Sequence, residues 1–113
     1  MPALNFKKQF APAVRDKTKR QTIRATRKRP IRIGNTLSLY TGMRTKSCEL
    51  LATTSCRLAV PILINRSTHT VYLAGRDLPR KEQVALARND GFTSLADFYL
   101  FFGDDFTGQL IIW

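Results

Sequence analysis

Apolar and polar side chains alternate in several short stretches of the chain, and this period of two predicts β-strands. The strongest alternation lies in residues 56–65, where Leu58, Val60, Ile62 and Ile64 share one face. Pro61 falls on the opposite face, which predicts a sheet edge or a bulge because proline has no backbone N–H to donate. Further strands are predicted at 4–6, 22–25, 46–51 and 108–113, and at 30–33 and 36–40 on either side of a turn at Gly34-Asn35.

In the last third of the chain the apolar side chains recur every three to four residues, which predicts two helices. The first spans residues 80–88 and begins after Asp77 or Pro79. The second follows Thr93 or Ser94. The side chains at helical spacing in this second helix are Leu95, Phe98, Tyr99 and Phe102. We expect them to form one buried face rather than a surface on which nucleobases stack.

Mostly short strands, a late pair of helices and a returning C-terminal strand predict an α+β fold, namely a small mixed β-barrel capped by helices. With 113 residues the chain can bury one modest core, so we expect a single domain over residues 1–113. No stretch reaches the roughly 18 apolar residues that span a bilayer. We therefore expect a cytoplasmic protein with no membrane partner.

The two cysteines, Cys48 and Cys56, are expected to be reduced thiols in or near the core. They are eight residues apart without a second pair, and the single histidine, His69, lies in a polar run that is typical of a loop. Neither a zinc site nor a disulfide framework fits this pattern. No metal or cofactor is therefore expected.

Charge is unevenly distributed along the chain, whose formal net charge is +11. Residues 1–46 contain thirteen Lys or Arg and one acid, whereas residues 47–113 contain six Lys or Arg and seven acids. A fold with one positive half attracts polyanions at long range, which predicts a nucleic-acid partner. Solubility alone does not require this segregation, and no basic stretch has the long apolar helical face that membrane-surface binding needs.

The basic segment from 15 to 29 has the composition of a shaped binding site. Eight of its fifteen side chains are cationic, but threonines and Ile23 interrupt them. Within six residues it combines an amine at Lys19, a hydroxyl at Thr22, a bidentate anion donor at Arg24 and an apolar anchor at Ile23. The residues predicted to bind nucleic acid are Lys17, Arg20, Arg24, Arg27, Lys28, Arg29 and Arg32.

These residues also carry a family resemblance. The run from Phe10 to Arg24, followed by Ile33-Gly34-Asn35 and a strand, resembles the opening of the ASCH domain, a compact relative of the PUA RNA-binding barrel. Asn89-Asp90-Gly91-Phe92 with Asp97-Phe98 is similar to the family's acidic helical segment, and residues 108–113 resemble its closing strand. The resemblance covers nearly the whole chain and implies a PUA-like barrel that binds RNA. Small domains of this kind also occur among bacteriophage proteins, which suits a stand-alone member of this length.

The resemblance further implies candidate catalytic residues. Family members similar to the bacterial N4-acetylcytidine amidohydrolase use a Lys and a Thr in a Lys-x-x-Thr-x-Arg run, and a Glu just before the second helix. The matching positions here are Lys19, Thr22, Arg24 and Asp90. Aspartate is one methylene shorter than glutamate, and capping of the neighbouring helix is the alternative role for Asp90. Family runs also begin with Gly-x-Lys, where this chain has Lys17-Thr18-Lys19.

The same residues can be interpreted without the family. An amide hydrolase needs a nucleophile, a base and an oxyanion donor, which Thr22, Lys19 and either backbone groups or Arg24 could supply. Repulsion from Lys17, Arg20 and Arg24 would lower the Lys19 pKa as a base requires, whereas a charged Lys19 would suit phosphate binding equally well. Residues three apart on a straight strand face opposite sides, so Lys19 and Thr22 can meet only if residues 20–21 form a turn or bulge.

Four functions remain open at this point. The first is a noncatalytic RNA-binding module whose basic half follows the backbone while the barrel cleft admits a base. The second is an amidohydrolase that acts on N4-acetylcytidine or a related modified nucleoside. The third is a metal-dependent ribonuclease, although the acidic residues form no clear metal cluster. The fourth is a protein whose basic face contacts an acidic protein partner.

Overall fold

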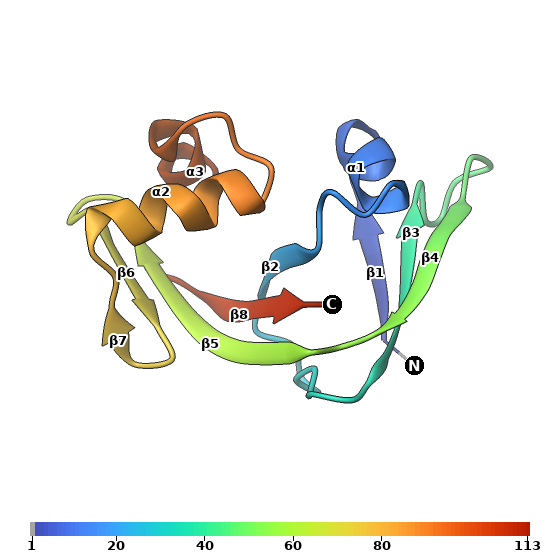
Figure 1. Ribbon diagram of the computed structural model, residues 1–113, viewed down its shortest axis with the longest axis horizontal. Helices are drawn as coiled ribbons and strands as arrows, with labels where there is room; N and C mark the ends of the chain where they lie inside the picture. The colour runs from blue at the N-terminus through green and yellow to red at the C-terminus, as the bar shows by residue number, and fades with distance from the viewer. Residues whose placement is uncertain (1) are drawn as a thin grey trace.

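The computed structural model describes residues 2–113 and shows an α+β fold with two β-sheets (Figure 1). The elements in chain order are β1 (Ala3–Phe6), the 3-10 turn η1 (Lys8–Phe10), α1 (Ala11–Arg15), β2 (Gln21–Ala25), β3 (Thr36–Thr41), β4 (Glu49–Ser55), β5 (Leu58–Asn65), β6 (Thr70–Leu73), β7 (Arg76–Asp77), α2 (Arg80–Asn89), α3 (Leu95–Phe102) and β8 (Phe106–Ile112). The first sheet has the strand order β1-β3-β4 and the second β2-β8-β5-β6-β7. Among the strands in residues 2–113, only β1 and β3 pair in parallel.

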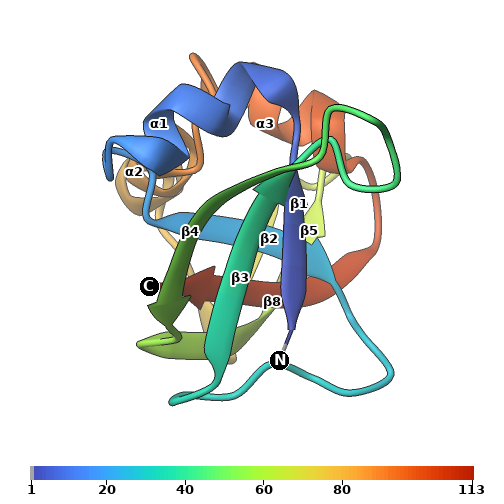
Figure 2. The ribbon, with the colours of Figure 1, turned by 90° about the vertical axis from the view of Figure 1, so that its right-hand side faces the viewer.

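The two sheets are separate hydrogen-bonded ladders that share a boundary at Cys56-Arg57, where β4 ends and β5 begins. In Figure 1, β5 and β4 follow one curved path along the lower side of the molecule, from the side of α2 and α3 to the side of β1 and β3. In Figure 2, β1, β3 and β4 cross in front of β2 and β8. Strands β1 and β2 each form the edge of a sheet and do not pair with one another. The α+β class and the two late helices are confirmed, but the sheets do not close into the predicted barrel.

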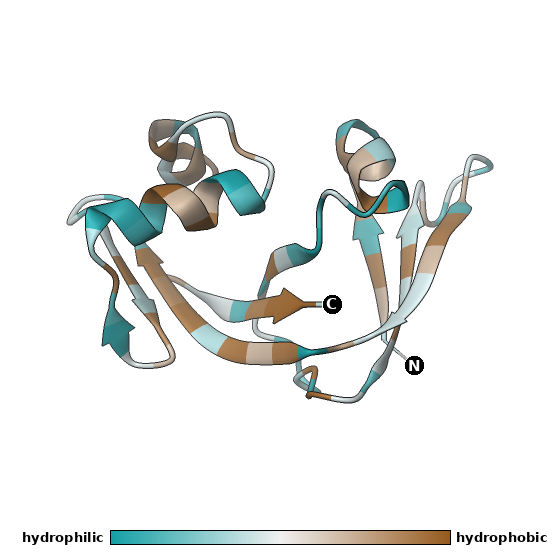
Figure 3. Ribbon diagram, in the orientation of Figure 1, coloured by the Kyte–Doolittle hydropathy of each residue, from teal (hydrophilic) through white to brown (hydrophobic). Residues whose placement is uncertain are grey.

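Strand β8 lies between β2 and β5, antiparallel to both, and its two faces are buried in different cores. Leu110 packs into a core with Ile62, Ile64 and Phe98, under α2 and α3. Ile111, from the opposite face, packs into a second core, whose members are Leu4, Phe6, Val14, Ile31, Leu37, Leu39, Cys56 and Trp113. Burial on both faces explains why the end of β8 is hydrophobic without alternation, as Figure 3 shows.

Both helices begin and end close to the predicted residues. Pro79 precedes α2 with extended backbone, and the Ser94 side chain accepts a hydrogen bond of 3.1 Å from the Asp97 N–H at the start of α3. Phe98 and Tyr99 are buried, which supports the prediction that the aromatic stripe of α3 packs into the core.

The prediction of a strand at 30–33 was wrong. A side-chain amide takes the place of a neighbouring strand there, because Gln109 donates to the Ile31 carbonyl at 2.8 Å and accepts from the Ile31 N–H at 3.0 Å. The adjacent turn at Gly34 forms as predicted. The predicted strand at 46–51 begins only at Glu49, and Cys48 is exposed rather than near the core.

Pro61 lies at a local edge of β5, as predicted. Pairing of β5 with β6 begins one residue later, at Ile62, so the missing N–H of Pro61 costs no ladder bond on that side. Strands β6 and β7 were not foreseen from the sequence. None of the helices in residues 2–113 is long and apolar enough to cross a membrane.

Candidate functional site

A cavity of about 270 Å³ gathers the predicted catalytic residues. It lies between the edge strands β1 and β2, the segment that joins α2 to α3, and the end of α3; we call it the Lys19 cleft. Its lining residues are Asn5, Phe6, Lys7, Phe10, Lys19, Thr22, Ile23, Arg24, Asp90, Phe92, Phe101 and Phe102. Lys19, Thr22 and Arg24 thus line one cleft, and Ile23 also packs into the core behind them.

The end of α1 places Lys19 in this cleft. Lys17 follows the helix with a φ of +70°, a left-handed conformation that reverses the chain. The backbone N–H groups of Thr18 and Lys19 then both donate to the Ala13 carbonyl, at 3.0 and 2.9 Å. Lys19 therefore lies before β2, which begins at Gln21, so strand alternation does not separate it from Thr22.

The floor of the cleft is a buried ion pair between Lys19 and Asp90, which are only 5% and 6% exposed. Lys19 Nζ donates to the Asp90 backbone carbonyl at 2.5 Å and lies 3.6 Å from its Oδ1. Gln21 Nε2 donates to Asp90 Oδ1 and to the Leu86 carbonyl, both at 3.3 Å. The ammonium group thus lies at the C-terminal, negative end of α2.

Asp90 directly follows α2, which ends at Asn89, and is the C-cap residue of that helix, whereas Ser94 caps the start of α3. Asp90 therefore does cap a neighbouring helix, but it caps the C-terminal end of α2 through its backbone N–H and not the start of α3. Its carboxylate is committed to Lys19 and Gln21 inside the cleft.

Burial perturbs both members of the pair in the direction of their neutral forms. Burial lowers the pKa of Lys19, Asp90 opposes this effect, and Arg24 adds to it. Burial raises the pKa of Asp90 to about 6 against the attraction of Lys19 and the hydrogen bond from Gln21. The direction predicted for Lys19 agrees, but its main cause is burial rather than crowding by cations.

Arg24 connects the two sheet edges and orients Thr22. Its Nε donates to Thr22 Oγ1 at 2.9 Å, and its Nη2 donates to the Asn5 carbonyl on β1 at 2.7 Å. The guanidinium also lies 4.8 Å from the centre of the Phe6 ring. Because Thr22 Oγ1 accepts from Arg24, the hydroxyl proton of Thr22 is left free to be donated to a ligand or a base.

Aromatic side chains that were not predicted to belong to the site form its walls. The Phe10 ring lies 5.1 Å from Lys19 Nζ, and Phe101, which is 57% exposed, stands at the rim with Lys7 Nζ 5.1 Å from its ring. Phe101 does not belong to the residues at helical spacing that form the buried face of α3. An aromatic residue outside that face is the feature of the sequence that could have indicated a role in the site. Nothing in the sequence marked Gln21 as a site residue. Its role comes from hydrogen bonds to α2, which is distant in the sequence.

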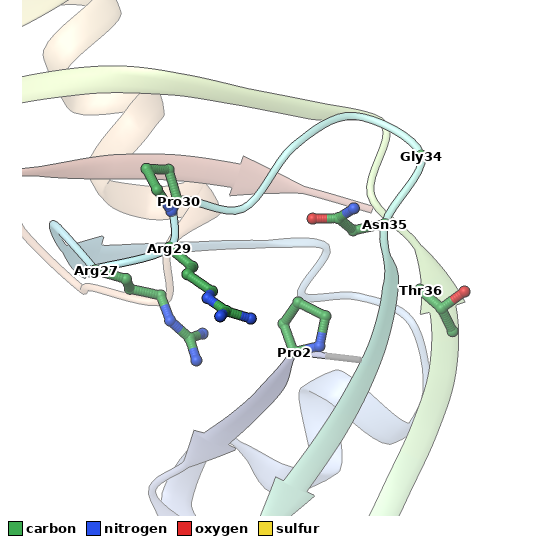
Figure 4. A pocket seen from close by; sticks show the side chains of 7 residues that line it. All are labelled: Pro2, Arg27, Arg29, Pro30, Gly34, Asn35 and Thr36. Atoms are coloured by element: carbon green, nitrogen blue, oxygen red, sulfur yellow. The ribbon is translucent and has the colours of Figure 1, made fainter.

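The basic residues predicted to bind nucleic acid do not all lie together. Arg24 lines the Lys19 cleft, whereas Arg27 and Arg29 line a separate cavity of about 560 Å³ with Pro2, Pro30, Gly34, Asn35 and Thr36 (Figure 4). The remaining members are exposed and line neither cavity; they are Lys17, Arg20, Lys28 and Arg32.

Within residues 2–113, no three His, Cys, Asp or Glu side chains form a group that could hold a metal ion. Comparisons with protein-family models, curated proteins and solved structures found no match.

Proposed function

We propose that the protein is an RNA-binding module of the ASCH type, and that the Lys19 cleft receives one unpaired nucleobase. The observation that carries this proposal is the combination of a buried polar floor with aromatic walls in one small cavity. Lys17 adds a second point: its left-handed backbone is the conformation that glycine adopts freely, at the position where the family run has Gly.

The dimensions and chemistry of the cleft suit a base. At about 270 Å³ it lies just below the range of roughly 300–1,000 Å³ that drug-sized ligands occupy. A flat ring can stack on Phe101 or Phe92, while the edge of the ring meets the hydroxyl of Thr22 and the charged groups of Lys19 and Asp90. A base that is paired in a duplex cannot present its edge in this way, so the proposal specifies an unpaired nucleotide.

Binding of cytidine and of short single-stranded RNAs, followed by NMR chemical shifts, tests the proposal. Thr22→Val keeps the shape of the side chain but leaves Arg24 Nε without its acceptor, so we expect affinity to fall about tenfold or more. Thr53→Val on the exposed face of β4 is the matched control and should bind as the wild type does. Equal affinity of both variants, or no binding by the wild type, would contradict the proposal.

A second candidate, hydrolysis of an acylated cytidine, is favoured by the hydroxyl, amine and carboxyl groups that share the cleft. Thr22 Oγ would attack the amide carbonyl carbon while a neutral Lys19 accepts the hydroxyl proton. Arg24 would stabilise the oxyanion, the proton would pass from Lys19 to the leaving amine as the C–N bond breaks, and water would release the acyl group from Thr22. Exclusion of water by the substrate would lower the Lys19 pKa further, in the direction that the mechanism needs.

Mass spectrometry of N4-acetylcytidine incubated with the protein tests this second candidate. Formation of cytidine and acetate by the wild type, and its loss in Thr22→Val, are the expected results. Asp90→Asn should lower turnover sharply with little change in substrate affinity, because the carboxylate orients Lys19. If the wild type binds N4-acetylcytidine without hydrolysing it, the second candidate is excluded and only the binding function remains.

A further inference from the structure

The boundary between the two sheets is open along the edges of β1 and β2. The only side-chain hydrogen bond that joins these two strands in residues 2–113 is the one from Arg24 to the Asn5 carbonyl. Beside it lies a hollow of about 480 Å³, which we call the middle hollow, lined among others by Arg27, Met43 and Arg44. The edges of β1 and β2 therefore border a groove, although the two sheets pack together elsewhere, where Ile111 of β8 shares a core with Leu4 and Leu39.

This groove connects the Lys19 cleft with the cavity of Figure 4, which we call the outer hollow. Asn5 and Arg24 line both the cleft and the middle hollow, and Arg27 lines both the middle and the outer hollow. In Figure 4 the guanidinium groups of Arg27 and Arg29 extend into the outer hollow on the side of Pro2. The three cavities thus form one path from the buried floor of the cleft to the loop that follows β2.

The middle and outer parts of the path are lined by cations without counterions. Its middle and outer parts are bordered by Arg24, Arg27, Arg29 and Arg44, and by no Asp or Glu. The ion pairs within residues 2–113 are Arg15–Glu49, Lys19–Asp90 and Arg76–Glu82, so Arg27, Arg29 and Arg44 are not neutralised by a carboxylate. Unpaired arginines along a groove favour a ligand with regularly spaced negative charges.

We infer that the ligand is a single-stranded RNA segment rather than a free nucleoside, and that the phosphates beside the base held in the Lys19 cleft run through the middle hollow to the outer hollow. Arg27, Arg29 and Arg44 contact these phosphates. This inference rests on the proposed function, because a base in the cleft fixes one end of the path. It adds that most of the affinity for RNA comes from the backbone, whereas the cleft selects the base.

Salt dependence of RNA affinity tests the path. A fluorescently labelled single-stranded oligonucleotide is titrated at several salt concentrations with the wild type and with a groove variant that combines Arg27→Gln, Arg29→Gln and Arg44→Gln. A control variant combines Arg57→Gln, Arg66→Gln and Arg80→Gln, which removes the same charge from exposed positions that line none of the three cavities of the path. Cytidine binding is measured for all three proteins.

The groove variant should lower the logarithmic salt slope by about 2, since each lost contact with single-stranded phosphate removes roughly 0.7. The control variant should keep the wild-type slope, and all three proteins should bind cytidine equally. Three results would overturn the path while leaving the base site intact. They are equal salt slopes for the two variants, a wild-type affinity for a heparin fragment equal to that for the RNA, and RNA binding by the wild type that is no tighter than its cytidine binding. A wild type that binds neither cytidine nor RNA would overturn the proposed function as well.

Discussion

Asp90→Asn should stabilise the fold at neutral pH, even though it breaks a buried ion pair. With an effective dielectric constant of about 20, the attraction across the 3.6 Å between Lys19 Nζ and Asp90 Oδ1 is about 5 kcal/mol. The pKa of Asp90 nevertheless rises from 3.8 to about 6, so burial outweighs this attraction. The rise corresponds to a net cost of about 3 kcal/mol for ionising Asp90 in the folded chain.

The sign of the pH dependence follows from the same shift. The folded state holds the Asp90 proton more tightly than the unfolded state does, so this contribution to stability is fully present below pH 3.8 and is lost as the pH rises through 6. Asparagine resembles the protonated carboxyl and still accepts from Gln21. Asp90→Asn should therefore match the wild type near pH 3 and exceed its free energy of unfolding by up to about 3 kcal/mol at pH 7.

Urea unfolding followed by the fluorescence of Trp113, the one tryptophan, measures this difference at each pH. Asp16→Asn is a control of opposite sign, because hydrogen bonds from the Thr18 hydroxyl and N–H lower the pKa of Asp16. As the pH rises through the pKa of Asp16, the free energy of unfolding of the wild type should increase relative to that of Asp16→Asn. An Asp90→Asn variant that is less stable than the wild type at pH 7 would refute the argument, and would mean that the ion pair stabilises the fold.

Two further substitutions test the backbone around the cleft. Gly91→Ala should destabilise the fold by about 1–3 kcal/mol and weaken ligand binding, because Gly91 has a φ of +100° and a Cβ there would lie 2.8 Å from the Phe10 ring. Thermal unfolding measures this loss. Gly34→Ala is the control and should lose less stability, because its φ is +90° but its Cβ would meet no atom within 4 Å. Lys17→Gly should raise stability by about 0.5–1 kcal/mol, because it relieves the left-handed backbone at an exposed position, and an unchanged or lower melting temperature would contradict this.

Local patterns predicted the elements whose hydrogen bonds and burial come from regular neighbours. The alternation of β5 and the helical spacing of α3 are of this kind. The strand predicted at 30–33 has the same alternation, but its backbone partner is the side chain of Gln109, distant in the sequence. The open boundary between the sheets could not be predicted either, since closure of a barrel depends on whether β1 and β2 pair and not on the pattern within either strand.

The site was predicted to the extent that its residues lie in one short segment with distinctive chemistry. Lys19, Thr22 and Arg24 are of this kind, and Asp90 was added by resemblance alone. The left-handed turn at Lys17, which brings Lys19 and Thr22 together, has no signal in the sequence because lysine does not favour that conformation. The walls of the cleft come from β1, η1 and α3, so their convergence is a property of the tertiary structure.

The position of β8 has a consequence for the order in which the chain can fold. Gln21 pairs with Ile112 and Ile23 with Leu110, so the central ladder of the second sheet joins residues from opposite ends of the chain. Both cores also need β8, because Leu110 completes one and Ile111 the other. Contacts between distant residues require costly loop closure and slow folding. During synthesis, neither half of the molecule can therefore reach its native packing before residues 106–113 have emerged from the ribosome, and β2 and β5 remain exposed strand edges until then.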